Sequence, residues 1–143
     1  MQMTGNTILI TGGNSGIGRA LAEAFHQLGN QVIISGRRQE ALDEVTAANP
    51  GMAALTVDMM DADSIKAFAA EATATHPGIN VVIHNAGIMK REMLADAPDF
   101  LATAEDTIAT NLLGPIRLTA ALLPHLLKQK DAAILTVSSG LAF

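Results

Sequence analysis

The chain has 143 residues, a formal net charge of −5, 49% hydrophobic but only 3% aromatic residues, and no cysteine. The lack of cysteine excludes a disulfide framework and a thiolate metal site, and the negative charge argues against nucleic acid or an anionic membrane as the main partner. No apolar run is long enough for a membrane span, and no signal-like segment precedes the first strand. We therefore expect one soluble, cytoplasmic domain over residues 1–143.

The first third of the chain contains a strand, a glycine-rich turn, a helix and a second strand. The apolar residues 7–10 predict the first strand, residues 11–18 the turn, residues 17–28 an amphipathic helix that ends at Gly29, and residues 32–34 the second strand. This order makes a βαβ unit, whose strands are parallel and whose crossover is right-handed.

The turn carries glycines with the spacing G-x-x-x-G-x-G. A pyrophosphate binds at a helix N-terminus only where the backbone comes within hydrogen-bonding distance, and larger side chains would block that approach. The turn therefore predicts dinucleotide binding; an ordinary glycine-rich turn between strand and helix is the alternative. We expect cofactor contacts from Gly12, Asn14, Ser15, Gly16, Ile17 and Gly18.

Strands and helices alternate along the rest of the chain. The pattern predicts helices over residues 39–48, from a cap at Asp61 or Asp63 to about residue 75, and over residues 103–128 with a kink at Gly114-Pro115; strands are expected at 53–57, 81–83 and 133–137, and residues 87–100 are expected to be irregular. Such alternation predicts an α/β fold, a doubly wound parallel sheet (Rossmann fold) with strand order 3-2-1-4-5 and a ligand site between the first and fourth strands.

Two arginines, Arg37 and Arg38, follow the second strand. A carboxylate at this place normally binds a free ribose 2′-hydroxyl, whereas guanidinium groups can pair with a 2′-phosphate. NADP(H) is therefore favoured over NAD(H), and a solvated pair at a helix start is the alternative. The turn lacks Gly-Lys-Ser or Gly-Lys-Thr, which argues against nucleotide hydrolysis, and a methyltransferase would want an acidic residue where the arginines stand.

Several motifs in this order resemble those of the short-chain dehydrogenases/reductases (SDR), over essentially the whole chain. They are the glycine turn that begins at Thr11, Asp58 after the third strand, Asn85-Ala86-Gly87 after the fourth, Asn111 in the long helix and Ser138-Ser139 after the fifth. The ending Ser-Ser-Gly-Leu-Ala-Phe resembles the DltE-like subgroup.

The resemblance implies roles for single residues. It places the pyrophosphate against the three glycines of the turn, the 2′-phosphate against Arg37, and the adenine between Asp58 and Met59. It implies that Asn85, Ala86 and Gly87 support the sheet and the ribose side of the cofactor. Asn111 resembles the active-site asparagine of the family, and Ser139 the serine that hydrogen-bonds the substrate carbonyl.

The family also uses a Tyr-x-x-x-Lys motif for proton transfer, and this chain contains no tyrosine. Loss of a general acid lowers a rate about 10²- to 10⁴-fold. We therefore expect the cofactor-binding N-terminal part of an NADP(H)-dependent oxidoreductase that acts on an alcohol or carbonyl group, incomplete before a sixth strand and inactive alone. The alternative is a non-catalytic nucleotide-binding or assembly module that a partner chain completes.

A sheet that stops at the fifth strand predicts exposed apolar side chains. We expect Val81, Ile83, Ile134, Leu135 and Val137 to be partly bare, and hence a homo-oligomer. The spacing of the four histidines predicts no metal site.

Overall fold

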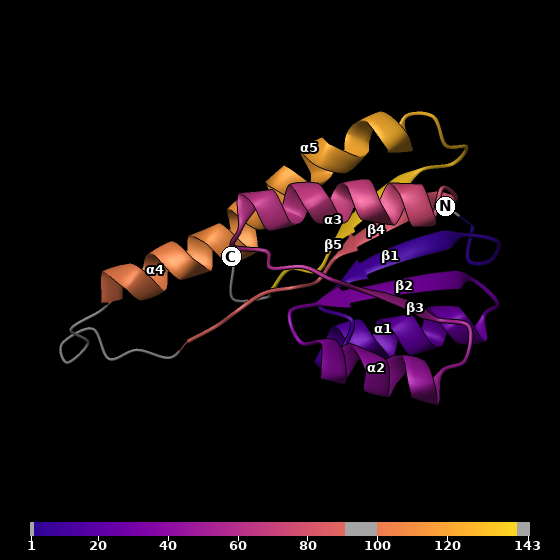
Figure 1. Cartoon of the computed structure of the whole chain (residues 1–143), viewed down its shortest axis with the longest axis horizontal. Coiled ribbons are helices and arrows are strands. Elements are labelled where there is room, and N and C mark those ends of the chain that lie inside the picture. Colours follow the sequence, from indigo (N-terminus) through magenta and orange to yellow (C-terminus); the bar gives the residue numbers. More distant parts are fainter. Residues whose placement is uncertain (1, 91–99, 140–143) are drawn as a thin grey trace.

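The computed structural model describes residues 2–90 and 100–139, which form one parallel five-stranded sheet with helices on both faces (Figure 1). The strand order is β3-β2-β1-β4-β5, as predicted. The elements are β1 (Thr7–Thr11), α1 (Gly16–Gln27), β2 (Gln31–Gly36), α2 (Gln39–Ala48), β3 (Ala53–Thr56), α3 (Ala62–Thr75), β4 (Ile79–His84), α4 (Phe100–Ile108), η1 (Ala109–Leu113), α5 (Gly114–Leu126) and β5 (Ala133–Thr136).

Two apolar clusters hold the layers together. Successive side chains of a strand point to opposite faces, so Leu9 packs with α3 and α5 while Ile8 and Ile10 pack with α1 and α2. All three side chains are fully buried. Burial on both faces explains why the central strands are continuous apolar runs rather than alternating ones.

Helix α1 does not bury the whole apolar face that its sequence predicts. Ile17 is 64% exposed and Leu28 is 47% exposed, whereas Gly18 and Ala22 are buried. The small residues let α1 lie close to the sheet, which leaves Ile17 at the carboxyl ends of the strands. Ile17 therefore does not belong to the buried face of α1.

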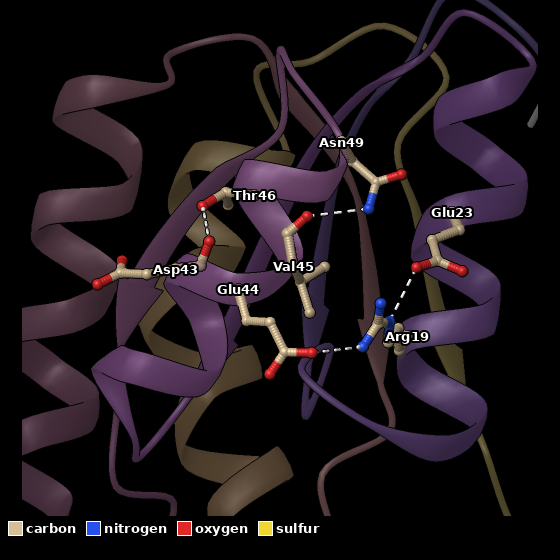
Figure 2. A network of polar contacts seen from close by, with 7 residues as sticks. All are labelled: Arg19, Glu23, Asp43, Glu44, Val45, Thr46 and Asn49. Carbon is tan, nitrogen blue, oxygen red and sulfur yellow. Dashed lines mark hydrogen bonds and ion pairs between the residues drawn. The ribbon is translucent and has the colours of Figure 1, made fainter.

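Helix α1 is also joined to α2 by polar contacts at the surface (Figure 2). The Arg19 guanidinium lies 2.8 Å from Glu23 Oε1 on its own helix and 3.5 Å from Glu44 Oε1 on α2. The hydrogen bond from Arg19 lowers the pKa of the Glu23 carboxyl. Exposed pairs of this kind contribute little to stability, so apolar burial dominates in holding α2 on the sheet.

The prediction of one long helix over residues 103–128 is confirmed, although its bounds differ by a few residues. The helix begins at Phe100, passes through the π-helical turn η1 and continues as α5 to Leu126. Gly114 is buried beside Met59, where a Cβ atom would lie 2.7 Å from the Met59 carbonyl oxygen. The π-helical turn lies directly before Gly114, where the kink was predicted, and Figure 1 shows α4 extending away from the sheet.

Of the two residues predicted as the cap of α3, Asp61 is the one observed, because its carboxylate accepts hydrogen bonds from the Asp63 and Ser64 amides.

The predicted exposure at the β5 side of the sheet is correct for three residues and wrong for two. Ile134, Leu135 and Val137 are 42%, 40% and 36% exposed. Val81 and Ile83 are buried, because they belong to the apolar cluster of α1 and α2, against which Leu21, Phe25 and Ala133 also pack.

Within the described part of the chain, no helix has both the length and the apolarity to cross a membrane.

Candidate functional site

A cleft of about 710 Å³ opens at the carboxyl ends of the central strands. In doubly wound sheets ligands bind at this edge, where the strand order reverses; here that point lies between β1 and β4. The residues that line it come from the ends of four strands and the loops that follow them, from the start of α1 and from η1: Gly12, Asn14, Ser15, Ile17, Gly36, Arg37, Arg38, Val57, Asp58, Met59, Asn85, Ala86, Gly87, Ile88 and Thr110.

The glycine turn is held against the end of β4. Gly12 has φ +68°, and a Cβ atom there would lie 2.9 Å from the Cα of Ala86. A Cβ atom on Gly18 would collide with the carbonyl oxygen of Gly12 and with the Asn85 amide. The two glycines thus let the turn pack closely on its neighbours. Gly16 and Gly18 do not appear among the described residues that line the cleft.

Asn85 and Thr11 join the turn to β4 by a set of hydrogen bonds. Asn85 Nδ2 donates to the carbonyl oxygens of Thr11 and Gly12 at 3.1 and 3.2 Å. Thr11 Oγ1 accepts from the backbone amides of Asn85 and Ala86, both at 3.1 Å. The segment Asn85-Ala86-Gly87 is therefore fixed relative to the turn, and Thr11 is a supporting residue that its sequence position alone does not identify.

The positive charge of the cleft comes from Arg37 and Arg38. Both side chains are exposed, and neither takes part in any of the ion pairs found among residues 2–90 and 100–139, which use Arg19 and Lys90. Gly36 ends β2 just before them. Two guanidinium groups thus stand at the cleft without a carboxylate partner, in a chain whose net charge is negative.

Asp58 and Met59 form the opposite wall. Asp58 Oδ1 accepts from the Met60 amide at 3.0 Å, and the Asp58 amide donates to Ser64 Oγ at 3.0 Å. Met59 is 4% exposed and belongs to the core cluster of α3 and α5. The carboxylate is therefore held in place by its own turn, on a loop that the core anchors.

The structure does not place the two predicted catalytic residues in the lining of the cleft. Asn111 lies in η1, where its Oδ1 accepts from the Ile88 amide and its Nδ2 donates to the Ile88 carbonyl, both at 2.8 Å. This pair fixes the loop after β4. Ser139 follows β5 and is exposed. Its predicted partner is the substrate carbonyl.

His84, at the end of β4, is 3% exposed, and its Nε2 lies 2.9 Å from Thr119 Oγ1 on α5. Burial lowers the pKa of its imidazole. The residue therefore packs between strand and helix as a neutral side chain.

Comparison with known proteins agrees with this fold. The family model of the short chain dehydrogenases matches residues 6–143. The chain therefore belongs to the short-chain dehydrogenase family. It is 41% identical to the uncharacterized oxidoreductase DltE of Bacillus subtilis, over 100% of this chain and 57% of the relative, and 34% identical to a fatty acyl-CoA reductase of Acinetobacter baylyi, over 96% of this chain and 48% of the relative.

Solved structures show the same relation. A short-chain dehydrogenase from Streptomyces avermitilis superposes with a TM-score of 0.85 at 34% identity, covering 97% of this chain and 51% of that one. L-sorbose reductase from Gluconobacter frateurii, in complex with NADPH and L-sorbose, gives a TM-score of 0.87 at 25% identity, covering 97% of this chain and 54% of that one. The chain thus spans about half the length of the relatives that it matches.

Proposed function

We propose that this chain is the cofactor-binding part of an NADP(H)-dependent oxidoreductase that acts on an alcohol or carbonyl group. The observation that carries the proposal is the pair Arg37 and Arg38, exposed in the cleft at the end of β2 and without a carboxylate partner among the described residues. A ribose 2′-phosphate would give both cations a partner. A free 2′-hydroxyl would find no carboxylate at Arg37 and Arg38 to accept its hydrogen bond.

The relatives support the choice of cofactor. The Gluconobacter reductase binds NADPH, and a putative short chain dehydrogenase from Shigella flexneri, with a TM-score of 0.84 and 28% identity, was solved in complex with NADP. In our proposal the pyrophosphate lies at the N-terminus of α1, the adenine lies beside Asp58 and Met59, and Asn85-Ala86-Gly87 supports the ribose on the other side.

For the chemistry, we propose that Ser139 hydrogen-bonds the substrate oxygen and that Asn111 serves the active site from η1. When bound, the cofactor supplies or accepts the hydride. The 143 residues contain no tyrosine, so the family's proton donor is not among them. We expect this chain to bind the dinucleotide and to show no measurable turnover, which an assay of NADPH oxidation with a panel of aldehydes and ketones would check.

The cofactor assignment is tested by Arg37→Ala. Because a charge-assisted hydrogen bond to a phosphate is worth about 1.5–3 kcal/mol, the Kd for NADPH should rise about 10- to 100-fold. The Kd for NADH should stay unchanged, because NADH has no 2′-phosphate. Titration calorimetry with both nucleotides gives the two values.

A matched control is Lys66→Ala, which removes one exposed positive charge on α3 outside the described cleft lining. It should leave both affinities unchanged. Equal losses for NADPH and NADH in Arg37→Ala would overturn the assignment to NADP(H).

The exposed apolar side chains on and beside β5 favour self-association in addition to cofactor binding. We propose that the chain self-associates through the β5 side of the sheet, where Ile134 and Leu135 are exposed and where Leu127, directly after α5, is 77% exposed. The second candidate function, an assembly module completed by a different chain, uses the same surface. A purified chain that remains monomeric and binds no nucleotide would support neither.

A further inference from the structure

Strand β5 is an edge of the sheet with apolar side chains on both faces. Among the described residues it pairs with β4 alone. Ile134 and Leu135, which point to opposite faces, are 42% and 40% exposed. An edge strand can pair with another chain, and native proteins often prevent this with a charged residue or a proline on that strand. Residues 132–139 contain neither, so β5 is able to accept a further strand.

The hydrogen bonds to β4 show which backbone groups of β5 point to the free edge. The Val137 amide donates to the His84 carbonyl at 2.8 Å, so the backbone groups of Val137 face β4. In a strand, the amide and carbonyl of each residue point to one side and those of the next residue to the other. Leu135 therefore also bonds toward β4, because the register is continuous. Ile134 and Thr136 direct their amides and carbonyls outward.

A second copy of the chain fits this edge in an antiparallel arrangement. In a closed two-fold dimer the same edge of each copy meets the other. A two-fold axis perpendicular to the sheet reverses the strand direction and keeps the faces of the two sheets aligned. Antiparallel strands exchange hydrogen bonds between residues that both point toward the neighbouring strand. Ile134 of one copy can therefore pair with Thr136 of the other, and the two copies of Leu135 then lie opposite each other on the axis.

This register pairs the whole strand and matches its side chains. It places residues 133–137 of one copy opposite residues 133–137 of the other. Leu135 then meets Leu135, and Ala133 meets Val137, on the face of the sheet that α1 and α2 cover. A shift by one residue would set outward backbone groups against inward ones, and a shift by two would leave part of the strand unpaired. The strand is thus complementary to itself in one register.

The charges near β5 do not oppose this pairing. Lys128, Lys130 and Asp131 lie in the turn before the strand. In an antiparallel pair the turns of the two copies lie at opposite ends of the interface. The two copies of Asp131 would be roughly 25 Å apart, about eight residues at 3.3 Å each, which exceeds the Debye length of about 8 Å at physiological salt. Only uncharged side chains meet along the strands.

We propose that two copies of this chain pair through their β5 edges, antiparallel and centred on Leu135, and so join their sheets into one continuous sheet. This inference rests on the proposed self-association through the β5 side, and it adds the orientation of the second copy and the residue on the two-fold axis. Because the strands of the two copies run in opposite directions, their cofactor clefts open at opposite edges of the joined sheet. Each cleft stays open to its own dinucleotide.

The chain has no cysteine, so single-cysteine variants oxidised with diamide report which residues of two copies meet. Leu135→Cys should form a disulfide-linked dimer, because directly opposed residues that do not share hydrogen bonds have Cα atoms about 4.5 Å apart, within the range of a disulfide. Ile134→Cys, at a similarly exposed position, should cross-link about tenfold more slowly, because its two copies would lie about 8 Å apart on a diagonal. An equimolar mixture of Ile134→Cys and Thr136→Cys should form the mixed dimer.

A matched control tests an exposed apolar position away from the strand. Ile116 on α5 is 55% exposed, and Ile116→Cys should remain uncross-linked under the same oxidation. Analytical ultracentrifugation of the unsubstituted chain at the same concentration measures self-association without any cysteine. Titration of each variant with NADPH checks that the fold and the cleft are intact.

The inference is overturned if Ile134→Cys cross-links as fast as Leu135→Cys, or if Ile116→Cys cross-links and Leu135→Cys does not. The first outcome leaves self-association through β5 in place with another orientation, and the second moves the association to α5. A monomeric unsubstituted chain would overturn both the self-association and this inference, and would leave the cofactor assignment intact.

Discussion

The central strands and strand β5 have similar sequences and different surroundings. Ile33, Leu9, Val82 and Ile134 stand in register across β2, β1, β4 and β5, and so share one face of the sheet. The first three are at most 1% exposed, whereas Ile134 is 42% exposed.

The opposite face repeats the contrast. Ile34, Ile10 and Ile83 are at most 2% exposed, and Leu135, in register with Ile83, is 40% exposed. The row on each face changes from buried to exposed in one step, between β4 and β5. An apolar strand sequence is thus necessary for burial, but it does not show that the strand is buried, because burial depends on which helices pack against the strand.

The largest expected effect comes from making the same truncation, Ile to Ala, at a buried position in β2 and at an exposed position in β5. Ile33→Ala should lower the free energy of unfolding by about 2–5 kcal/mol, because it leaves a cavity in the packed core. Ile134→Ala should lower it by about 1 kcal/mol or less, because its site is already open to solvent. Urea unfolding followed by circular dichroism gives both values, and equal losses would show that β5 is covered in solution.

A second prediction concerns self-association through the open face. Leu135→Lys places a charge on β5 at a position that is already exposed. Charged side chains on exposed edge strands disfavour pairing with other chains, so the mass measured by analytical ultracentrifugation should fall toward that of the monomer. Lys66→Ala, on α3, should leave the mass unchanged. An unchanged mass in Leu135→Lys would place the association surface elsewhere.

The smallest effect concerns His84, which joins β4 to α5 through Thr119. Burial lowers the pKa of folded His84 below its ordinary value of 6.5. The unfolded chain then binds a proton at a higher pH than the folded chain does, so this side chain contributes stability above about pH 6.5 that is lost as the pH falls below it. His84→Gln should flatten the pH dependence of the urea midpoint between about pH 5 and 7. The same slope in both proteins would mean that folding does not lower the pKa of His84.

Much of the site could be predicted because its signals are local. The glycine turn, Arg37 and the segment Asn85-Ala86-Gly87 follow strands in the sequence, and parallel strands bring their carboxyl ends to one edge. Ten of the twelve predicted cofactor residues line the cleft; Gly16 and Gly18 do not. Gly18 is instead required by the close packing of the turn on Asn85, a contact between residues far apart in the chain.

Thr110, which also lines the cleft, could not be found in this way, because it does not follow a strand. It lies in a π-helical turn beside Gly114 and Met59, so its place at the cleft is fixed only once α5 has packed on the loop after β3. The sequence likewise does not decide between Asp61 and Asp63 as the cap of α3. Both residue types suit a cap, and the backbone conformation at Asp61 decides between them.

The amino-acid sequence alone determined the order of strands and helices, the parallel sheet and the position of the dinucleotide loop, because hydrophobic periodicity and glycine spacing act within a few residues of one another. The tertiary structure decided which apolar side chains are covered and where the last helix is interrupted. These depend on contacts between distant segments. Ile83 and Leu135 show the difference: both are aliphatic strand residues in register on the face that α1 and α2 cover, and the packing of these helices buries the first and leaves the second exposed.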